Sequence, residues 1–182
     1  MGRQTDRIAT AYWAVPQAHN IGHYDAEAAN DLNVFQEKFR YPTEHEMLAN
    51  CILQAIYNAK GFILYSYFDL YKGPEEGQFD RRWPEVCRVG ADLRELSDYL
   101  LGDAPMRKIV FRGDGGILRG GLFTADDGQR CVLIAAPHGP VKGSFTLPAG
   151  WKPQSRYGLV RHLGGNRWEF SSDGAAAELL ID

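Results

Sequence analysis

The segment that follows residues 9–15 carries a group of hydrogen-bonding side chains. Residues 9–15 (ATAYWAV) have the pattern of a buried strand, and Pro16 ends it. Gln17, His19 and Asn20 come next, and their amide and imidazole groups can bind hydroxyl groups or cap free backbone groups of a loop. The sequence leaves both interpretations open, and the first would make this segment the edge of a binding site.

A second set of such residues lies in residues 62–71 (FILYSYFDLY), which we expect to form a strand. Apolar groups on both of its faces are typical of a parallel strand covered on both sides. With a period of two, Tyr65, Tyr67 and Asp69 share one face, where Asp69 can bind hydroxyls or serve as an acid. Alternatively, both tyrosines are packing residues, and Asp69 pairs with an arginine or caps a turn.

Signatures of other site chemistry are weak. His19, His23 and Asp25 fall within one loop, without the spacing of a typical metal-ligand set. The glycine-rich residues 112–121 lie between predicted strands, not between a strand and a helix as in a phosphate-binding loop, and no G-x-S-x-G motif occurs. We therefore predict no metal and no cofactor.

The helix that positions the second set is marked at its start. Thr43 and Glu46 have the spacing of a capping box, and Lys60-Gly61 supplies a basic last turn and a stop. An apolar stripe lies between them at residues 48, 52, 55, 56 and 59. This helix running into the strand at 62–71 is half of an α/β unit. A second helix is predicted from Trp83-Pro84 to Gly102, and residues 26–39 are predicted as loop or one irregular helical turn.

The periodicity changes from helical to alternating after Asp103. We predict strands at residues 108–112, 117–124, 130–136, 141–147, 157–163, 167–170 and 175–181. Asp126-Asp127-Gly128 and Gly164-Gly165-Asn166 are hairpin signals between neighbouring strands. Short strands at this spacing indicate a small antiparallel β-sandwich at residues 104–182, preceded by a separate α/β segment at residues 1–103.

Composition and charge exclude several classes of partner. The chain has 182 residues, 45% of them apolar, and a net charge of −3 without a run of Lys and Arg, so we predict no nucleic-acid partner. No stretch approaches the roughly 18 apolar residues of a membrane-spanning helix, and residues 1–10 lack a signal-peptide core. Cys51, Cys87 and Cys131 are odd in number and far apart, which indicates structural thiols and no disulfide framework.

The order of motifs resembles that of a known enzyme class. It comprises QAHN at residues 17–20, PTEHEMLANCILQAIYNAKGFILYSYFDL at 42–70, WPEV at 83–86 and LSDYLL at 96–101, followed by a compact β-domain. This order is similar to the last third of a (β/α)8-barrel glycoside hydrolase of the clan A type. The resemblance covers the seventh and eighth β/α units and the C-terminal β-sandwich.

The resemblance implies a partial TIM barrel of two β/α units, because a complete barrel needs about 250 residues. It also implies a carbohydrate partner, bound at the barrel mouth by Gln17, His19, Asn20, Tyr65, Tyr67 and Asp69. In such enzymes the acid/base follows the fourth strand, which is absent here, and the nucleophile follows the seventh, where this chain has Gln17. The chain alone thus lacks the catalytic carboxylate pair, and its longer parent, secreted or periplasmic if an upstream signal directs it, would be the glycosidase.

A second hypothesis is a non-catalytic module that binds carbohydrate or protein through the β-domain. Trp151, Tyr157 and Trp168 can form an aromatic platform for a sugar, or they can all be buried in the sandwich. Two units of an open barrel also expose strand edges and an apolar helix face. We therefore expect self-association through the exposed barrel edges.

Overall fold

The computed structural model describes residues 11–28, 30–71, 76–113 and 116–182, without the side chain of His23. Ala9 and Thr10 of the first predicted strand lie outside the described residues, as does the imidazole of His23. The helical elements are η1 (Ile21–Tyr24), α2 (Leu32–Lys38), α3 (Glu44–Ile56), α4 (Tyr67–Tyr71), α5 (Gln78–Glu95) and α6 (Ser97–Leu101). The strands are β1 (Tyr12–Ala14), β2 (Ala59–Phe62), β3 (Arg107–Lys108), β4 (Arg119–Thr124), β5 (Arg130–Ala136), β6 (Val141–Thr146), β7 (Gln154–Ser155), β8 (Val160–Gly164), β9 (Arg167–Ser172) and β10 (Ala176–Ile181).

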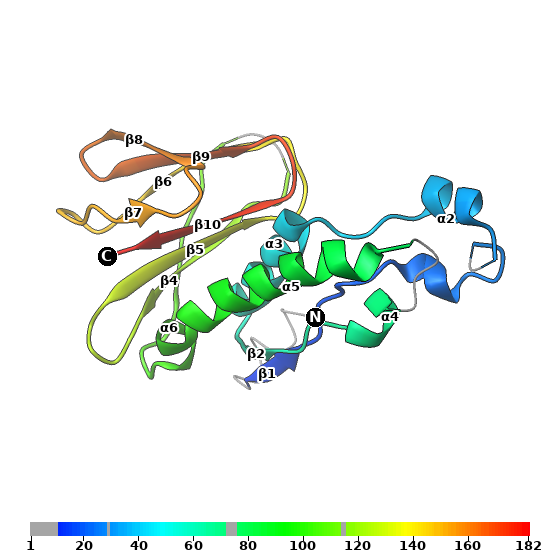
Figure 1. Cartoon of the computed structure of the whole chain (residues 1–182). Coiled ribbons are helices and arrows are strands. Elements are labelled where there is room, and N and C mark those ends of the chain that lie inside the picture. The colour runs from blue at the N-terminus through cyan, green and yellow to red at the C-terminus, as the bar shows by residue number, and fades with distance from the viewer. Residues whose placement is uncertain (1–10, 29, 72–75, 114–115) are drawn as a thin grey trace.

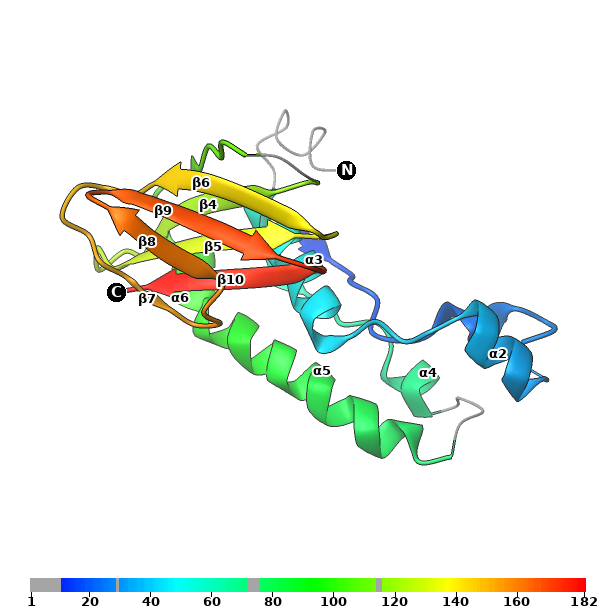
Figure 2. The same cartoon turned by 90° about the horizontal axis from the view of Figure 1, so that it is seen from above.

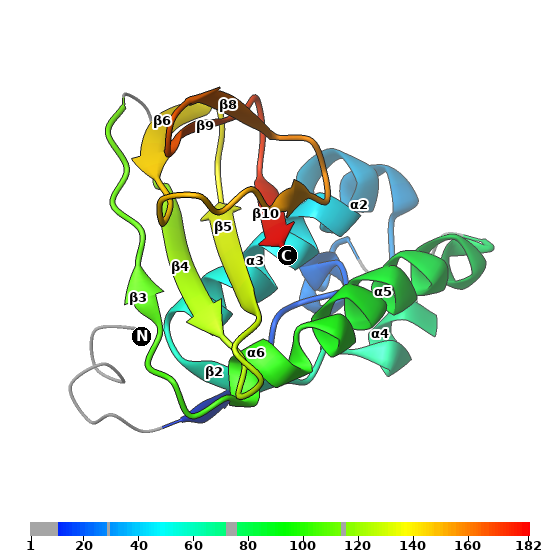
Figure 3. The same cartoon turned by 90° about the vertical axis from the view of Figure 1, so that its left-hand side faces the viewer.

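Two antiparallel sheets follow residue 103 and pack face to face (Figure 3). One has the order β3-β4-β5-β10-β7, and the other has the order β6-β9-β8. Buried apolar side chains of both sheets, among them Ile134, Phe145 and Phe170, form one core between them. The turns at Gly128 and at Gly164-Gly165 have positive φ angles, as hairpin turns require. The predicted mixture of helices and antiparallel sheets is confirmed.

Helices α3 and α5 cover the other face of the five-stranded sheet (Figures 1 and 2). Ile52 of α3, Val89 of α5 and Leu133 of β5 belong to the same buried cluster. Beneath α3 lies a small parallel sheet of β1 and β2, with α3 as the crossover between the two strands. Segments 1–103 and 104–182 therefore share one core, and their status as separate domains stays a prediction. Within the described residues, the strands form no closed barrel.

Helix α3 begins as predicted. Thr43 is its N-cap, and the capping box with Glu46 is formed in both directions. The predicted end at Lys60-Gly61 is wrong, because Asn58 adopts φ of +75° and stops the helix after Ile56. Lys60 and Gly61 instead belong to β2, which pairs with β1.

The predicted strand at residues 62–71 is also wrong. Regular strand ends at Phe62, and Tyr65 makes an isolated parallel bridge to Gln17. Ser66 then starts helix α4, because its hydroxyl accepts from the backbone N–H of Asp69 at 3.2 Å. Ser-x-x-Asp is a helix-start spacing that the aromatic and apolar composition of the segment concealed.

Two further helices differ from the predictions. Helix α5 runs from Gln78 to Glu95, so Pro84, which was predicted to lie in the first turn, lies inside the helix. Leu96 separates α5 from the short helix α6, which ends just before Gly102. Residues 26–39, predicted as loop or one irregular helical turn, contain the seven-residue helix α2, whose N-cap Asp31 accepts from the N–H groups of the first turn. Phe35 of this helix is fully buried.

The capping box at Thr43 makes the stability of the fold dependent on pH. Ion pairing with Arg40, at 2.5 Å between Nη2 and Oε1, is the main reason that the pKa of Glu46 falls to about 2. Because this pKa is depressed on folding, the stabilisation is complete above about pH 4.5 and is lost as the pH falls towards 2. Glu46→Gln is expected to lower the free energy of unfolding by about 1 kcal/mol at pH 7, since exposure screens the pair.

Urea unfolding at a series of pH values measures this effect. The wild-type and Glu46→Gln proteins should differ at pH 7 and converge as the pH approaches 2. A difference that stays constant from pH 7 to pH 2 would show that the Glu46 charge has no part in the stabilisation.

Candidate functional site

The carboxyl ends of β1 and β2 lie side by side and bring the two sets of polar residues together. Their pairing continues beyond the regular strands, with Tyr65 N–H donating to Pro16 O at 2.9 Å and Ala18 N–H donating to Tyr65 O at 2.5 Å. Side chains that follow Pro16 and those that follow Tyr65 therefore leave the sheet at the same edge. We call the group formed there by His19, Asn20, Tyr24, Tyr65 and Asp69 the strand-end cluster.

His19 is the centre of the strand-end cluster. Its side chain is buried, and Nδ1 lies 3.1 Å from the backbone oxygen of Tyr65. The rings of Tyr24 and Tyr65 contact the imidazole edge to face, with centroid distances of 5.8 and 5.4 Å. Both contacts fix the orientation of the tyrosine side chains relative to His19.

Asn20 shapes the segment that carries Tyr24. It is the N-cap of η1, and its Oδ1 accepts from the backbone N–H of Gly22 at 2.9 Å. Asn20 is only 1% exposed, and within the described part of the chain its Nδ2 has no hydrogen-bond acceptor. A buried amide donor of this kind is costly unless an acceptor is supplied.

Asp69 joins the two halves of the strand-end cluster. Its carboxylate is buried and accepts a hydrogen bond from Ser66 Oγ. The side chains of Tyr65 and Asp69 lie close to the Tyr24 phenol, and their hydrogen-bonding groups, with the negative charge of Asp69, raise the pKa of Tyr24 above its usual value. The phenol therefore stays protonated at neutral pH, and its one O–H is the donor in these interactions within the cluster.

Five of the six predicted site residues meet at this edge. Gln17 is the most exposed of the polar ones, and its Nε2 donates to the backbone oxygen of His19 at 2.7 Å, which is the loop-capping role left open by the sequence. Tyr67 is the exception. The prediction that it shares a strand face with Tyr65 and Asp69 is wrong, because α4 turns its ring onto Phe79 and Trp83 of α5.

The sequence did not identify Tyr24 of the strand-end cluster, or Ser66, which is hydrogen bonded to Asp69. Tyr24 lies five residues beyond His19 in the same polar segment, but nothing in its spacing pointed to contact with residues 65–69. Ser66 had a signal, since Ser-x-x-Asp is a capping motif. Reading that motif would have placed Ser66 beside Asp69 and removed Tyr67 from the strand.

The strand-end cluster can make several hydrogen bonds to a ligand and can offer it an aromatic surface. Asp69 is its one carboxylate among the described residues, whereas glycoside hydrolysis in its commonest form uses two. No three His, Cys, Asp or Glu side chains in the described ranges lie together so as to hold a metal ion. Cys51, the thiol nearest in sequence, is buried in α3, and burial raises its pKa to about 12. A thiol of that pKa is a poor nucleophile at neutral pH.

Comparisons with known proteins give no assignment for this arrangement. A scan against models of protein families, a search of curated proteins and a search of solved structures each found no match. Among the described residues, none of the helices has the length and apolar character needed to cross a membrane.

Proposed function

We propose that the chain is the C-terminal portion of a glycoside hydrolase, in which the strand-end cluster binds carbohydrate and the β-sheets brace it. The single observation that carries this proposal is the convergence of Tyr24, Tyr65 and Asp69 at the carboxyl ends of two parallel strands. In (β/α) barrels, active sites form at this end of the strands. The parallel β1-α3-β2 unit is of the kind from which such barrels are built, and this supports a partial barrel in residues 1–103.

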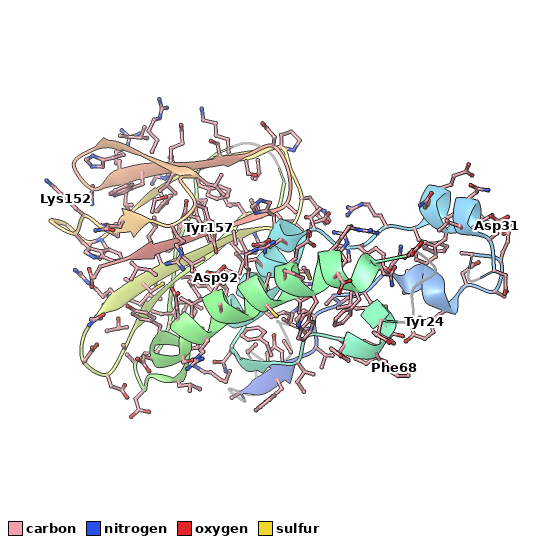
Figure 4. The ribbon with its side chains drawn as sticks, in the orientation of Figure 1. Tyr24, Asp31, Phe68, Asp92, Lys152 and Tyr157 are labelled. Carbon is pink, nitrogen blue, oxygen red and sulfur yellow. The ribbon has the colours of Figure 1, made fainter. Side chains whose placement is uncertain are left out.

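A sugar is the ligand class that suits these groups. Its hydroxyls are both donors and acceptors, and the cluster offers two acceptors, the carboxylate of Asp69 and the phenol oxygen of Tyr24. Tyr24, Tyr65 and Phe68 are 62%, 47% and 59% exposed, so aromatic surface is available for the apolar face of a pyranose ring. Tyr24 and Phe68 lie near one another at the end of the molecule away from the antiparallel sheets (Figure 4).

The chain contributes binding groups and no complete hydrolytic machinery to this proposal. Gln17 occupies the position at which the resemblance places a nucleophile, and its amide can only donate and accept hydrogen bonds. Hydrolysis would then belong to a longer protein that supplies carboxylates to the same mouth.

The alternative of a sugar-binding β-domain has less support. Trp151 and Trp168 are buried in the core between the two antiparallel sheets. The hydroxyl of Tyr157 donates to Asp92 of α5 at 2.5 Å. These three residues therefore do not form an exposed aromatic platform.

Saccharide binding tests the proposal. We expect neutral oligosaccharides to bind the chain at millimolar or lower concentration in NMR titrations, and Asp69→Asn to weaken that binding about tenfold or more. The reason is the loss of a charge-assisted hydrogen bond, worth about 1.5–3 kcal/mol.

Asp173→Asn, on the exposed turn between β9 and β10, is the matched control and should bind as the wild type does. Circular dichroism of each variant checks that the fold is intact. The proposal fails if the folded wild type binds no saccharide in the panel, or if Asp69→Asn binds as tightly as Asp173→Asn.

A further inference from the structure

The outer face of the β6-β9-β8 sheet is rich in cations although the chain has a net charge of −3. Phe145 and Phe170 point into the core, so the residues that alternate with them point outward. The outward residues include Lys142 and Thr146 of β6, Arg161 of β8, and Arg167 and Glu169 of β9. This sheet is the layer farthest from helix α5 (Figure 2).

Two of these cations share the one acid on the same face. Glu169 lies 2.8 Å from Arg161 and 3.4 Å from Lys142, and these contacts lower the pKa of its carboxyl group. Arg161 and Lys142 therefore have a counter-charge within the sheet. Arg167 lies two residues before Glu169 on the same face of β9, opposite Thr146 of β6, and it is outside this ion-pair group.

Arg167 shares a separate hollow with a second arginine. The hollow has a volume of about 470 Å³ and is lined by Val110, Arg112, Ser144, Phe145, Thr146 and Arg167. Arg112 is held there by two backbone hydrogen bonds to Ser144, each of 2.8 Å. Within the described residues, neither guanidinium forms an ion pair, and no carboxylate lines the hollow.

Arg112 and Arg167 both line the hollow, and two guanidinium groups brought together there, with no counter-charge among the described residues, repel each other. An anion between them would remove that repulsion and accept hydrogen bonds from both planar forks, a geometry that suits carboxylate, sulfate and phosphate groups. The hydroxyl of Thr146 adds a neutral donor beside Arg167. The chemistry of the hollow is therefore that of a site for an oxyanion.

We propose that this hollow binds the sulfate or carboxylate group of an acidic saccharide. That the anion is carried by a saccharide rests on the proposed carbohydrate function, whereas the preference for an anion rests on Arg112 and Arg167 alone. Nucleic acid fits less well, because Phe145 is buried and the hollow offers no exposed aromatic ring on which a base can stack. The site lies on the β-sandwich and does not include any residue of the strand-end cluster.

Titrations with a sulfated oligosaccharide, an oligouronate and a neutral oligosaccharide of equal length test this proposal. We expect Arg167→Gln and Arg112→Gln each to weaken binding of the acidic saccharides about tenfold. The matched control, Arg161→Gln, removes an exposed but paired cation of the same sheet and should change binding less than about twofold. Affinity for the acidic saccharides should also fall as salt is raised.

Three results would overturn the proposal. They are the absence of binding by either acidic saccharide, equal losses in Arg167→Gln and Arg161→Gln, and equally tight binding of single-stranded DNA with the same number of charges. Neutral saccharide binding that is lost in Asp69→Asn and unchanged in Arg167→Gln would uphold the strand-end site independently. Acidic saccharide binding that depends on Arg167 and not on Asp69 would uphold this hollow even if the strand-end site fails.

Discussion

Replacing Glu178 by alanine is expected to lower the free energy of unfolding by about 3–5 kcal/mol. Glu178 lies in β10 and is completely buried. Its carboxylate accepts from the backbone N–H groups of Tyr157 at 2.9 Å and Leu159 at 2.7 Å, and from the hydroxyl of Ser155 at 2.8 Å. Alanine would leave these donors without an acceptor inside the protein.

The segment that Glu178 holds also joins the sheets to helix α5. Arg156 lies 3.3 Å from Asp92 and 3.0 Å from Glu95, and Tyr157 donates to Asp92. Asp92 and Tyr157 point toward one another across this contact (Figure 4). Loss of the Glu178 acceptor therefore loosens the segment and its attachment to α5 together.

Urea unfolding followed by tryptophan fluorescence measures the change. Glu178→Gln keeps one oxygen acceptor but turns an amide donor toward an N–H group, so an intermediate loss is expected. Glu95→Ala removes an exposed ion pair of the same segment and should cost less than about 1 kcal/mol. If Glu178→Ala costs no more than Glu95→Ala, the carboxylate does not hold the segment.

Sequence patterns predicted the fold well where a residue caps the backbone of its own helix or sets the conformation of its own turn. The capping box of Thr43 and the glycines at positions 128 and 164 act within a few residues, so helix α3 and the hairpins of the antiparallel sheets were predictable. Residues 62–71 were not, because a buried strand end and the short helix α4 have the same apolar and aromatic composition. The start of α5 at Gln78 was missed because its N-cap, Gly77, makes no side-chain hydrogen bond that a sequence pattern could reveal. The prediction therefore placed Pro84 in the first turn.

The candidate site was predictable only as two separate halves. Gln17, His19 and Asn20 were identified because they follow a predicted strand, and Tyr65 and Asp69 because their polar groups can bind hydroxyls. Their convergence depends on the parallel pairing of β1 with β2, which no local pattern specifies. Glu178 was hidden for a similar reason, since a glutamate in an alternating strand is expected to face solvent, and its partners lie 19 to 23 residues away.

We expect the chain to self-associate, and we expect the replacement of Trp13 and Ile63 together by serine to make it a monomer. Both side chains lie on the face of the β1-β2 sheet opposite α3, and they are 68% and 51% exposed. The ring of Trp13 lies over the backbone of Gly61, which joins the two strands into one apolar surface. In the described structure each of these strands also has one unpaired edge, and such edges favour pairing with another chain.

We expect two copies to associate through this face. The double replacement by serine should raise the dissociation constant by about a hundredfold or more, because each copy loses two large apolar side chains that association would remove from water. Sedimentation velocity of the folded proteins measures it, and Val110→Ser, at an exposed apolar residue elsewhere, is the matched control. A monomeric wild type, or an equal effect of Val110→Ser, would contradict this assignment. In the proposed longer hydrolase the same face would be covered by the remaining barrel strands, so a monomeric wild type would also mean that residues 11–103 need no further strands and would count against the partial barrel.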